Sequence, residues 1–216
     1  DIRDFHRRDH RRVAGLGEDV LITTNRPHDY GFAGVRLVED TRPGAGALGG
    51  LHTALSAARG ETVLVLACDM PFASRPLLEH LLSLAAQADV VIPKWRGEYE
   101  PLCAVYARQC LAPVEAALDA GERRMISFFS RVRVFPLEEP EWSSFDPDGL
   151  TFFNVNTPEE LAEKEARKAC KQKICDIIAT RDPNGDDVSC DIVKTWREED
   201  IAKMLGGKIG WPWGKA

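Results

Sequence analysis

Residues 64–72 read LVLACDMPF, and this stretch decides the fold. A short apolar run of this kind is typical of a strand that is buried on both faces of a helix-covered sheet. Such a strand delivers the residue that follows it to the carboxyl edge of the sheet, where open α/β folds bind their ligands. Asp69 stands at that point and is the first candidate for a functional residue.

Similar apolar runs recur on both sides of this stretch and alternate with helical patterns. This alternation predicts an α/β fold with a Rossmann-like, mainly parallel sheet flanked by helices. Helices are expected over 51–59, 75–87 and 111–120, and another begins after Thr157. The expected strands are DVLITTN (19–25), GVRLVED (34–40), TVLVLACD (62–69), DVVIPKW (89–95), EPLCAVY (100–106), RVRVFPL (131–137) and TFFNVN (151–156).

The same patterns divide the chain into three parts. Residues 1–17 form an N-terminal segment without an assignment, and residues 18–170 form the α/β domain. Residues 171–216 change in character, and we expect a small α+β extension there, with two strands around a turn and a short helix.

Composition limits the classes of function. A chain of 216 residues with 44% apolar residues can bury a sizeable core. Its apolar runs are far shorter than the roughly 20 residues of a membrane helix, its first residues do not resemble a signal peptide, and six cysteines are too few for a disulfide scaffold. These features predict a cytoplasmic protein without a membrane partner. The net charge of −6 is concentrated between the two ends, which argues against a nucleic-acid partner.

Asp69 is a candidate metal ligand. Mg²⁺ prefers one or two carboxylates together with phosphate oxygens and water, so an aspartate at the edge of the sheet can hold the ion against a nucleotide. The alternative is that Asp69 caps the helix expected over 75–87.

A glycine cluster is the second candidate element. In PGAGALGGLHTAL (43–55), Gly44, Gly46, Gly49 and Gly50 lead into a helix. Glycines before a helix N-terminus let backbone N–H groups approach an anion or a planar base closely. A plain tight connection between two elements is equally consistent with this pattern.

Two pairs of polar side chains complete the candidates. Asn154 and Asn156 lie in FFNVNTPEEL (152–161), where strand alternation would put both amides on one side, near Asp69. The alternative is that Asn156 or Thr157 only caps the following helix. Arg123 and Arg124 in AGERRMISFF (120–129) would offset phosphate charge, or they form a solvated surface pair.

Taken in order, these motifs resemble a known family. The elements TTNRP, VEDTRPGAGALGGL, ACDMPF, EPLCAVY, AGERRMISFF and FFNVNTPEEL resemble the molybdenum cofactor guanylyltransferases, the MobA-like branch of the nucleotidyltransferases. The resemblance covers residues 13–166, and the ACDMPF and NVNTPEEL elements are its most specific parts.

The resemblance implies an activity and a set of site residues. In the family, GMP is transferred from GTP to molybdopterin with release of pyrophosphate, so Mg²⁺ is the implied cofactor, and GTP and molybdopterin are the implied partners. Asp69 is the implied catalytic metal ligand. The implied nucleotide-binding residues are Asn25, Asp40, Gly46, Leu48, Gly49 and Gly50, and the implied molybdopterin-side residues are Arg123, Arg124, Asn154 and Asn156.

The sequence departs from the family pattern in one respect. Family members open with a strand and a loop of the type L-x-G-G-x-S-x-R-M-G-x-x-K, and residues 1–20 do not match it. The missing strand would be central, so two strands would lack a partner, and a tail strand or a second copy of the chain is expected to pair there. A homodimer is therefore one expected assembly, and a molybdoenzyme or another cofactor-synthesis protein is a further candidate partner.

Two other functions stay open at this point. One is a non-catalytic molybdopterin-binding or interaction protein derived from the same fold. The other is a nucleotidyltransferase that acts on a different phosphorylated acceptor, because one fold can serve several chemistries.

Overall fold

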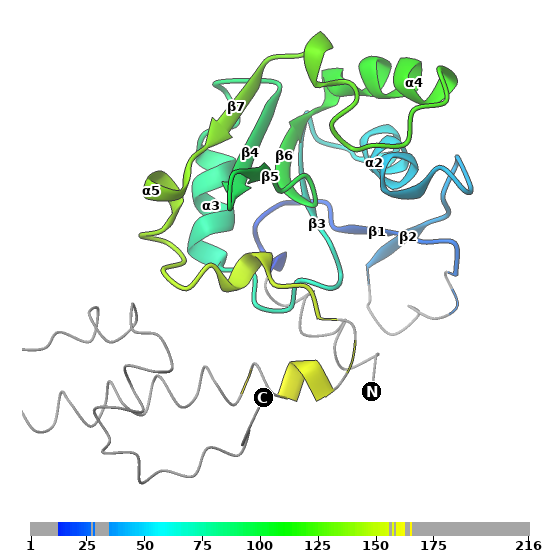
Figure 1. Cartoon of the computed structure of the whole chain (residues 1–216). Coiled ribbons are helices and arrows are strands. Elements are labelled where there is room, and N and C mark those ends of the chain that lie inside the picture. Colours follow the sequence, from blue (N-terminus) through cyan, green and yellow to red (C-terminus); the bar gives the residue numbers. More distant parts are fainter. Residues whose placement is uncertain are drawn as a thin grey trace, which may run out of the picture. The chain divides into compact units, whose positions relative to one another are not determined.

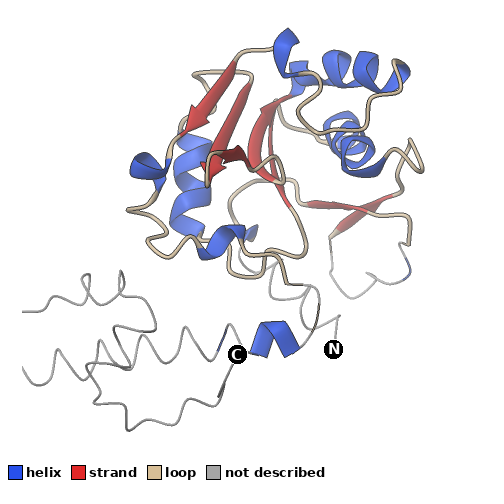
Figure 2. Cartoon of the chain, viewed as in Figure 1, coloured by secondary structure: helices blue, strands red, loops and turns tan. Residues whose placement is uncertain are grey.

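The computed structural model describes residues 13–26, 28, 35–155, 157, 159–162 and 165. The chain divides into two units, Asp1–Pro158 and Glu159–Ala216. Figure 2 shows helices on both sides of a sheet in the first unit. The extension expected over 171–216 lies outside the described residues, as does the tail strand expected to pair with the sheet, and the domain limits stay a prediction.

The central sheet is built from five strands. β3 (Thr62–Leu66) pairs with β6 (Cys103–Ala107), which pairs with β4 (Val90–Trp95), and β4 also pairs with β5 (Glu98–Tyr99) and β7 (Val134–Leu137). β6 runs antiparallel to both β3 and β4, whereas β4 and β7 are parallel. β3, β4 and β7 therefore end at the same edge.

Side chains of the central strands alternate between two cores. Val90, Ile92, Ala104 and Tyr106 belong to one buried cluster, which includes residues of α2 (Gly46–Ala57) and α4 (Leu111–Asp119). The intervening strand residues belong to a second cluster on the other face, with α3 (Arg75–Ser83) and α5 (Glu139–Trp142). Figure 1 shows α3 and the α2–α4 pair on opposite sides of the sheet. This two-faced burial explains why the strands read as continuous apolar runs.

β1 and β2 form a separate sheet. β1 (Leu21–Thr23) and β2 (Arg36–Val38) pair in parallel, with Thr23 opposite Val38. Within the described part of the chain, β1 and β3 each have a strand neighbour on one side only. The two strands without a second partner that the sequence predicts are therefore present.

The structure corrects the expected strand over TFFNVN. Residues Leu150–Phe152 form a 3-10 helix, and no strand follows it up to Val155. The buried carboxylate of Asp146 causes this, because it accepts hydrogen bonds from the backbone N–H groups of Leu150 (3.2 Å) and Thr151 (2.7 Å). The expected strand is therefore wrong up to Val155, and Asn156 lies outside the described residues.

Two helix limits also differ from expectation. The helix expected over 51–59 begins earlier, at Gly46, so Gly46, Gly49 and Gly50 lie in its first turns and only Gly44 precedes it. The helix expected over 75–87 ends at Ser83, and turns follow. The expected helix after Thr157 is present, because residues 159–162 and 165 are helical. None of the helices in the described part of the chain is long and apolar enough to cross a membrane.

Asp89 anchors β4 and β7 at the edge opposite the candidate site. Its buried carboxylate accepts hydrogen bonds from the backbone N–H of Arg133 (2.8 Å) and from the Arg133 guanidinium (2.9 Å). These contacts hold the pKa of Asp89 below its ordinary value of 3.8. The ionised form therefore stabilises the fold above that ordinary value, and this stabilisation is lost as the pH falls through the lowered pKa.

We expect Asp89→Asn to lower the free energy of unfolding at pH 7 by about 2 kcal/mol, because the amide cannot accept both hydrogen bonds as an anion does. Urea unfolding at a series of pH values measures this. The difference between wild type and variant should shrink as the pH falls below about 4. A difference that stays constant down to pH 2.5 would mean that the charge of Asp89 contributes nothing.

Candidate functional site

Asp69 lies in the turn that follows β3, at the carboxyl edge of the sheet. The neighbouring Cys68 is exposed, and Met70 to Ala73 are buried, so the chain turns inward directly after Asp69. The Oδ1 atom of Asp69 is buried and accepts no hydrogen bond from a described residue. The cap of α3 is Ser74 and not Asp69, so the capping alternative is wrong. A buried carboxylate oxygen without a donor raises the free energy of the folded state unless a cation binds it.

Asn154 is brought next to this turn. The backbone N–H of Val155 donates to the carbonyl oxygen of Asp69 at 2.8 Å, which places the preceding Asn154 beside Asp69. The segment is fixed from behind, because the Thr151 hydroxyl accepts a hydrogen bond from the backbone N–H of Ser74 (2.9 Å). The side chain of Asn154 is exposed and free to meet a ligand. Asn156 lies outside the described residues.

Asn25 and Asp40 come together at the ends of β1 and β2. Each follows its strand by two residues, and the register pairs the two strand ends, Thr23 and Val38. Asn25 is exposed. The Oδ1 atom of Asp40 accepts hydrogen bonds from the Thr53 hydroxyl and from the backbone N–H of Arg42, both at 3.0 Å. Asp40 thereby ties the strand end to α2 through one oxygen.

The glycine-rich turn of α2 combines packing with accessibility. A Cβ atom on Gly49 would lie 2.7 Å from the Cβ of Ala45 and 3.0 Å from the carbonyl oxygen of Arg42, so Gly49 allows close backbone packing. A Cβ on Gly50 would meet only the Thr23 hydroxyl, at 3.7 Å. Gly46 is exposed, with φ +66°, at the helix start. Leu48 is fully buried, so only its backbone could serve a ligand.

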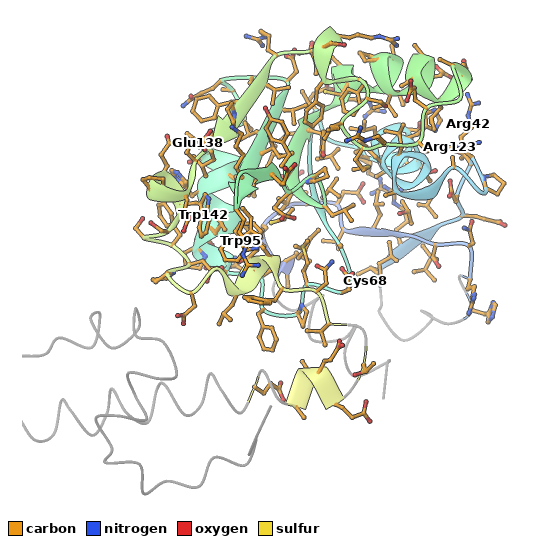
Figure 3. The ribbon with its side chains drawn as sticks, in the orientation of Figure 1. Arg42, Cys68, Trp95, Arg123, Glu138 and Trp142 are labelled. Atoms are coloured by element: carbon orange, nitrogen blue, oxygen red, sulfur yellow. The ribbon has the colours of Figure 1, made fainter. Side chains whose placement is uncertain are left out.

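Arg123 and Arg124 lie apart from the other candidates. Both are exposed in the loop after α4, and the structure gives their side chains no hydrogen bond or ion pair with a described residue. Figure 3 shows Arg123 toward α2 and α4, near Arg42, and Cys68 near the end of β3. Arg42 itself is held by Asp119 (3.0 Å) and Glu115 (3.4 Å) of α4. The structure therefore does not bring the arginine pair into contact with Asp69 or Asn154.

The sequence patterns did not indicate the aromatic cluster that lies at the end of β4. Trp95 lies 5.8 Å from Trp142, 5.6 Å from Phe152 and 6.1 Å from Phe153, measured between ring centroids. The indole N–H of Trp142 donates to the carbonyl oxygen of Lys94 at 2.9 Å. Figure 3 shows Trp95 and Trp142 close together beside the end of β4. This cluster supports the segment that carries Asn154.

Comparisons with known proteins identify the family. The model of the MobA-like NTP transferase domain matches residues 5–134. The chain belongs to the MobA-like NTP transferase family. A molybdenum cofactor guanylyltransferase from Desulfosudis oleivorans is 34% identical over 167 residues, which cover 77% of this chain and 83% of that relative. A probable molybdenum cofactor guanylyltransferase from Chloroflexus aggregans is 36% identical over 149 residues, covering 68% of this chain and 72% of the relative.

Solved structures agree with the family and the fold of this MobA-like chain. The crystal structure of molybdopterin-guanine dinucleotide biosynthesis protein A from Archaeoglobus fulgidus has a TM-score of 0.58 at 28% identity, covering 70% of this chain and 78% of that one. A cytidylyltransferase from Thermus thermophilus, at 16% identity and a TM-score of 0.56, shares the fold. The resemblance and the α/β fold class with helices on both faces of a sheet are therefore confirmed. The expectation of a mainly parallel sheet is corrected, because β6 and β5 run antiparallel to their neighbours and the central sheet is mixed. The assignments of individual site residues stay predictions.

Proposed function

We propose that this chain is a molybdenum cofactor guanylyltransferase that transfers GMP from GTP to molybdopterin and releases pyrophosphate. The relative from D. oleivorans carries that name. The observation that carries the proposal is the buried Oδ1 atom of Asp69 without a hydrogen-bond partner, at the edge of the sheet and beside Asn154.

Asp69 fits a magnesium ion that a nucleotide helps to hold. Its orphaned carboxylate oxygen supplies one anionic ligand, and the described residues contain no group of three or more His, Cys, Asp or Glu that could bind a metal alone. One carboxylate combined with phosphate oxygens and water is the usual environment of Mg²⁺ beside nucleotides. When bound, the ion supplies positive charge that offsets the charge of the phosphates.

The reaction requires positioning more than covalent chemistry. An oxygen of the molybdopterin phosphate attacks the α-phosphorus of GTP, the bond from that phosphorus to the bridging oxygen breaks, and pyrophosphate leaves. Asn25 and Asp40, with the first turn of α2, hold the base and the ribose. Asp69 would hold the metal ion, which would offset the charge of the phosphates, and the Asn154 amide donates to a phosphate oxygen on the acceptor side. Arg123 and Arg124 approach the acceptor phosphate when it is bound.

Calorimetry of GTP binding tests the nucleotide site. Wild type should bind GTP with micromolar affinity in the presence of Mg²⁺ and far more weakly when the metal is chelated. Asp69→Ala should lose the Mg²⁺-dependent part of the binding, because no other carboxylate at this turn can replace it. Glu61→Gln is the matched control, since Glu61 is an exposed carboxylate at the opposite end of β3. Equal binding by wild type and Asp69→Ala would contradict the assignment of Asp69.

A further inference from the structure

Glu100 is the second carboxylate at the carboxyl edge of the sheet that lacks a partner among the described residues. It lies between β5 and β6, and its side chain is half-buried. The structure gives its carboxylate no hydrogen bond or ion pair with any described residue. Its desolvation is therefore not compensated within the described part of the chain.

Backbone hydrogen bonds fix the position of Glu100. Its N–H donates to the carbonyl oxygen of Pro93 in β4 at 2.9 Å, and its carbonyl oxygen accepts from the N–H of Cys103 in β6 at 3.0 Å. Leu66, the last residue of β3, is opposite Cys103 in the register. Asp69 follows β3 by three residues, so both carboxylates extend beyond the same edge of the sheet.

Three other described carboxylates that are removed from water, unlike Asp69, are compensated. Asp19 pairs with Arg36, and Asp89 pairs with Arg133. Asp146 accepts two backbone N–H groups. Burial raises the pKa of Glu100 to about 7, and no neighbouring cation counteracts this rise. An uncompensated carboxyl group beside a candidate site indicates a role in binding or catalysis, because it lowers the free energy of unfolding and makes no contact that holds the fold together.

We propose that the Glu100 carboxylate accepts hydrogen bonds from the ring N–H and the amino group of a 2-amino-4-oxopyrimidine ring. Pterin and guanine share this edge, and two parallel N–H donors match the two oxygens of a carboxylate. The proposal rests on the proposed function and adds a residue that selects the substrate. Asn25 and Asp40 lie beyond β3 on the side of β1 and β2, whereas Glu100 lies on the side of β6 and β4 (Figure 1), which favours the pterin of the acceptor.

Binding of two probes to Glu100→Gln tests the proposal. Pterin binding is followed by the intrinsic fluorescence of the ring, and GTP binding by calorimetry with Mg²⁺. Glutamine keeps the shape but loses one of the two acceptors, so we expect pterin affinity to fall about tenfold while GTP affinity is unchanged. Glu98→Gln is the control, because Glu98 is an exposed carboxylate on the same hairpin. It should leave both affinities unchanged.

The outcomes distinguish a pterin ring from a guanine ring at Glu100, and they distinguish failure of the Glu100 proposal from failure of the proposed function. A fall in GTP affinity alone, with loss of the preference for GTP over ITP, would assign Glu100 to guanine, because ITP lacks the amino group. Three outcomes would overturn the Glu100 proposal and leave the proposed function intact. In the first, Glu100→Gln changes the affinity for neither probe. In the others, wild type binds GTP but not pterin, or binds GTP and ITP equally well. Wild type that binds neither probe would overturn both.

Thermal unfolding distinguishes ligand binding from a structural role. The raised pKa means that the contribution of Glu100 to stability is complete below its ordinary pKa and is lost as the pH rises through about 7. The Cys103 thiol interacts electrostatically with Glu100 and with Asp146, burial raises the pKa of this thiol as well, and Asp146 is held by backbone N–H groups. We therefore expect Glu100→Gln to unfold about 3 °C higher than wild type at pH 8, with no difference at pH 5. A lower midpoint at pH 8 would show that Glu100 supports the fold and would overturn the proposal.

Discussion

Asp69→Asn should lower the rate of GMP transfer by roughly 10²- to 10³-fold, which is the usual loss when a preorganised group that stabilises charge in a transition state is removed. The amide cannot supply an anionic ligand at the turn after β3, where the Oδ1 atom of Asp69 is buried without a donor. Release of pyrophosphate from saturating GTP and molybdopterin, at several concentrations of Mg²⁺, measures this loss. The concentration of Mg²⁺ at half-maximal rate should rise together with the fall in rate.

The stability of the variant separates chemistry from folding. The folded state of wild type carries the free-energy penalty of desolvating the Asp69 carboxylate, and the neutral amide removes this penalty. The midpoint of thermal unfolding of Asp69→Asn should therefore not fall. Glu61→Gln should retain the wild-type rate and the wild-type midpoint. A variant that is folded and turns over within threefold of the wild-type rate would refute the role of Asp69 in the transfer.

Gly149→Ala should lower the free energy of unfolding by about 3 kcal/mol, the sum of backbone strain and a steric collision. Gly149 has φ +60°, and a Cβ atom there would lie 2.4 Å from Cζ3 and 2.6 Å from Cη2 of Trp95. Trp95 is surrounded by Trp142, Phe152 and Phe153, so its ring cannot move without repacking the cluster. Urea unfolding followed by tryptophan fluorescence measures the change.

Gly97→Ala is the matched control that measures backbone strain without the steric collision. Gly97 has φ +85° at the tip of the β4–β5 hairpin, and a Cβ atom there would meet nothing within 4 Å. The control should therefore cost only about 1 kcal/mol. Equal losses in the two variants would mean that the contact between Gly149 and Trp95 does not constrain the fold.

Most of the sheet could be predicted from the sequence because its central strands are buried on both faces. The apolar runs around Thr62–Leu66, Val90–Trp95 and Cys103–Ala107 leave little ambiguity once helices alternate with them. The position of Asp69 followed from the same reasoning, since a buried strand must end at an edge of the sheet.

Specific side-chain and backbone hydrogen bonds account for what the sequence did not reveal. The run TFFNVN has strand composition, but the carboxylate of Asp146 diverts Leu150–Phe152 into a 3-10 helix. Asn154 still arrives beside Asp69, through the hydrogen bond from Val155 and not through strand alternation. Glu100 looks like a surface residue in the sequence, because its desolvation depends on packing between Pro93 and Cys103 that no local pattern encodes.

Product analysis tests whether this chain transfers GMP to molybdopterin. The protein is incubated with GTP, molybdopterin and Mg²⁺, and the reaction is followed for pyrophosphate and for the guanine dinucleotide of molybdopterin. We predict that both products form in equal amounts and only when GTP, molybdopterin and Mg²⁺ are all present. Binding of molybdopterin without formation of either product would contradict the account and would favour a non-catalytic molybdopterin-binding protein built on the same fold.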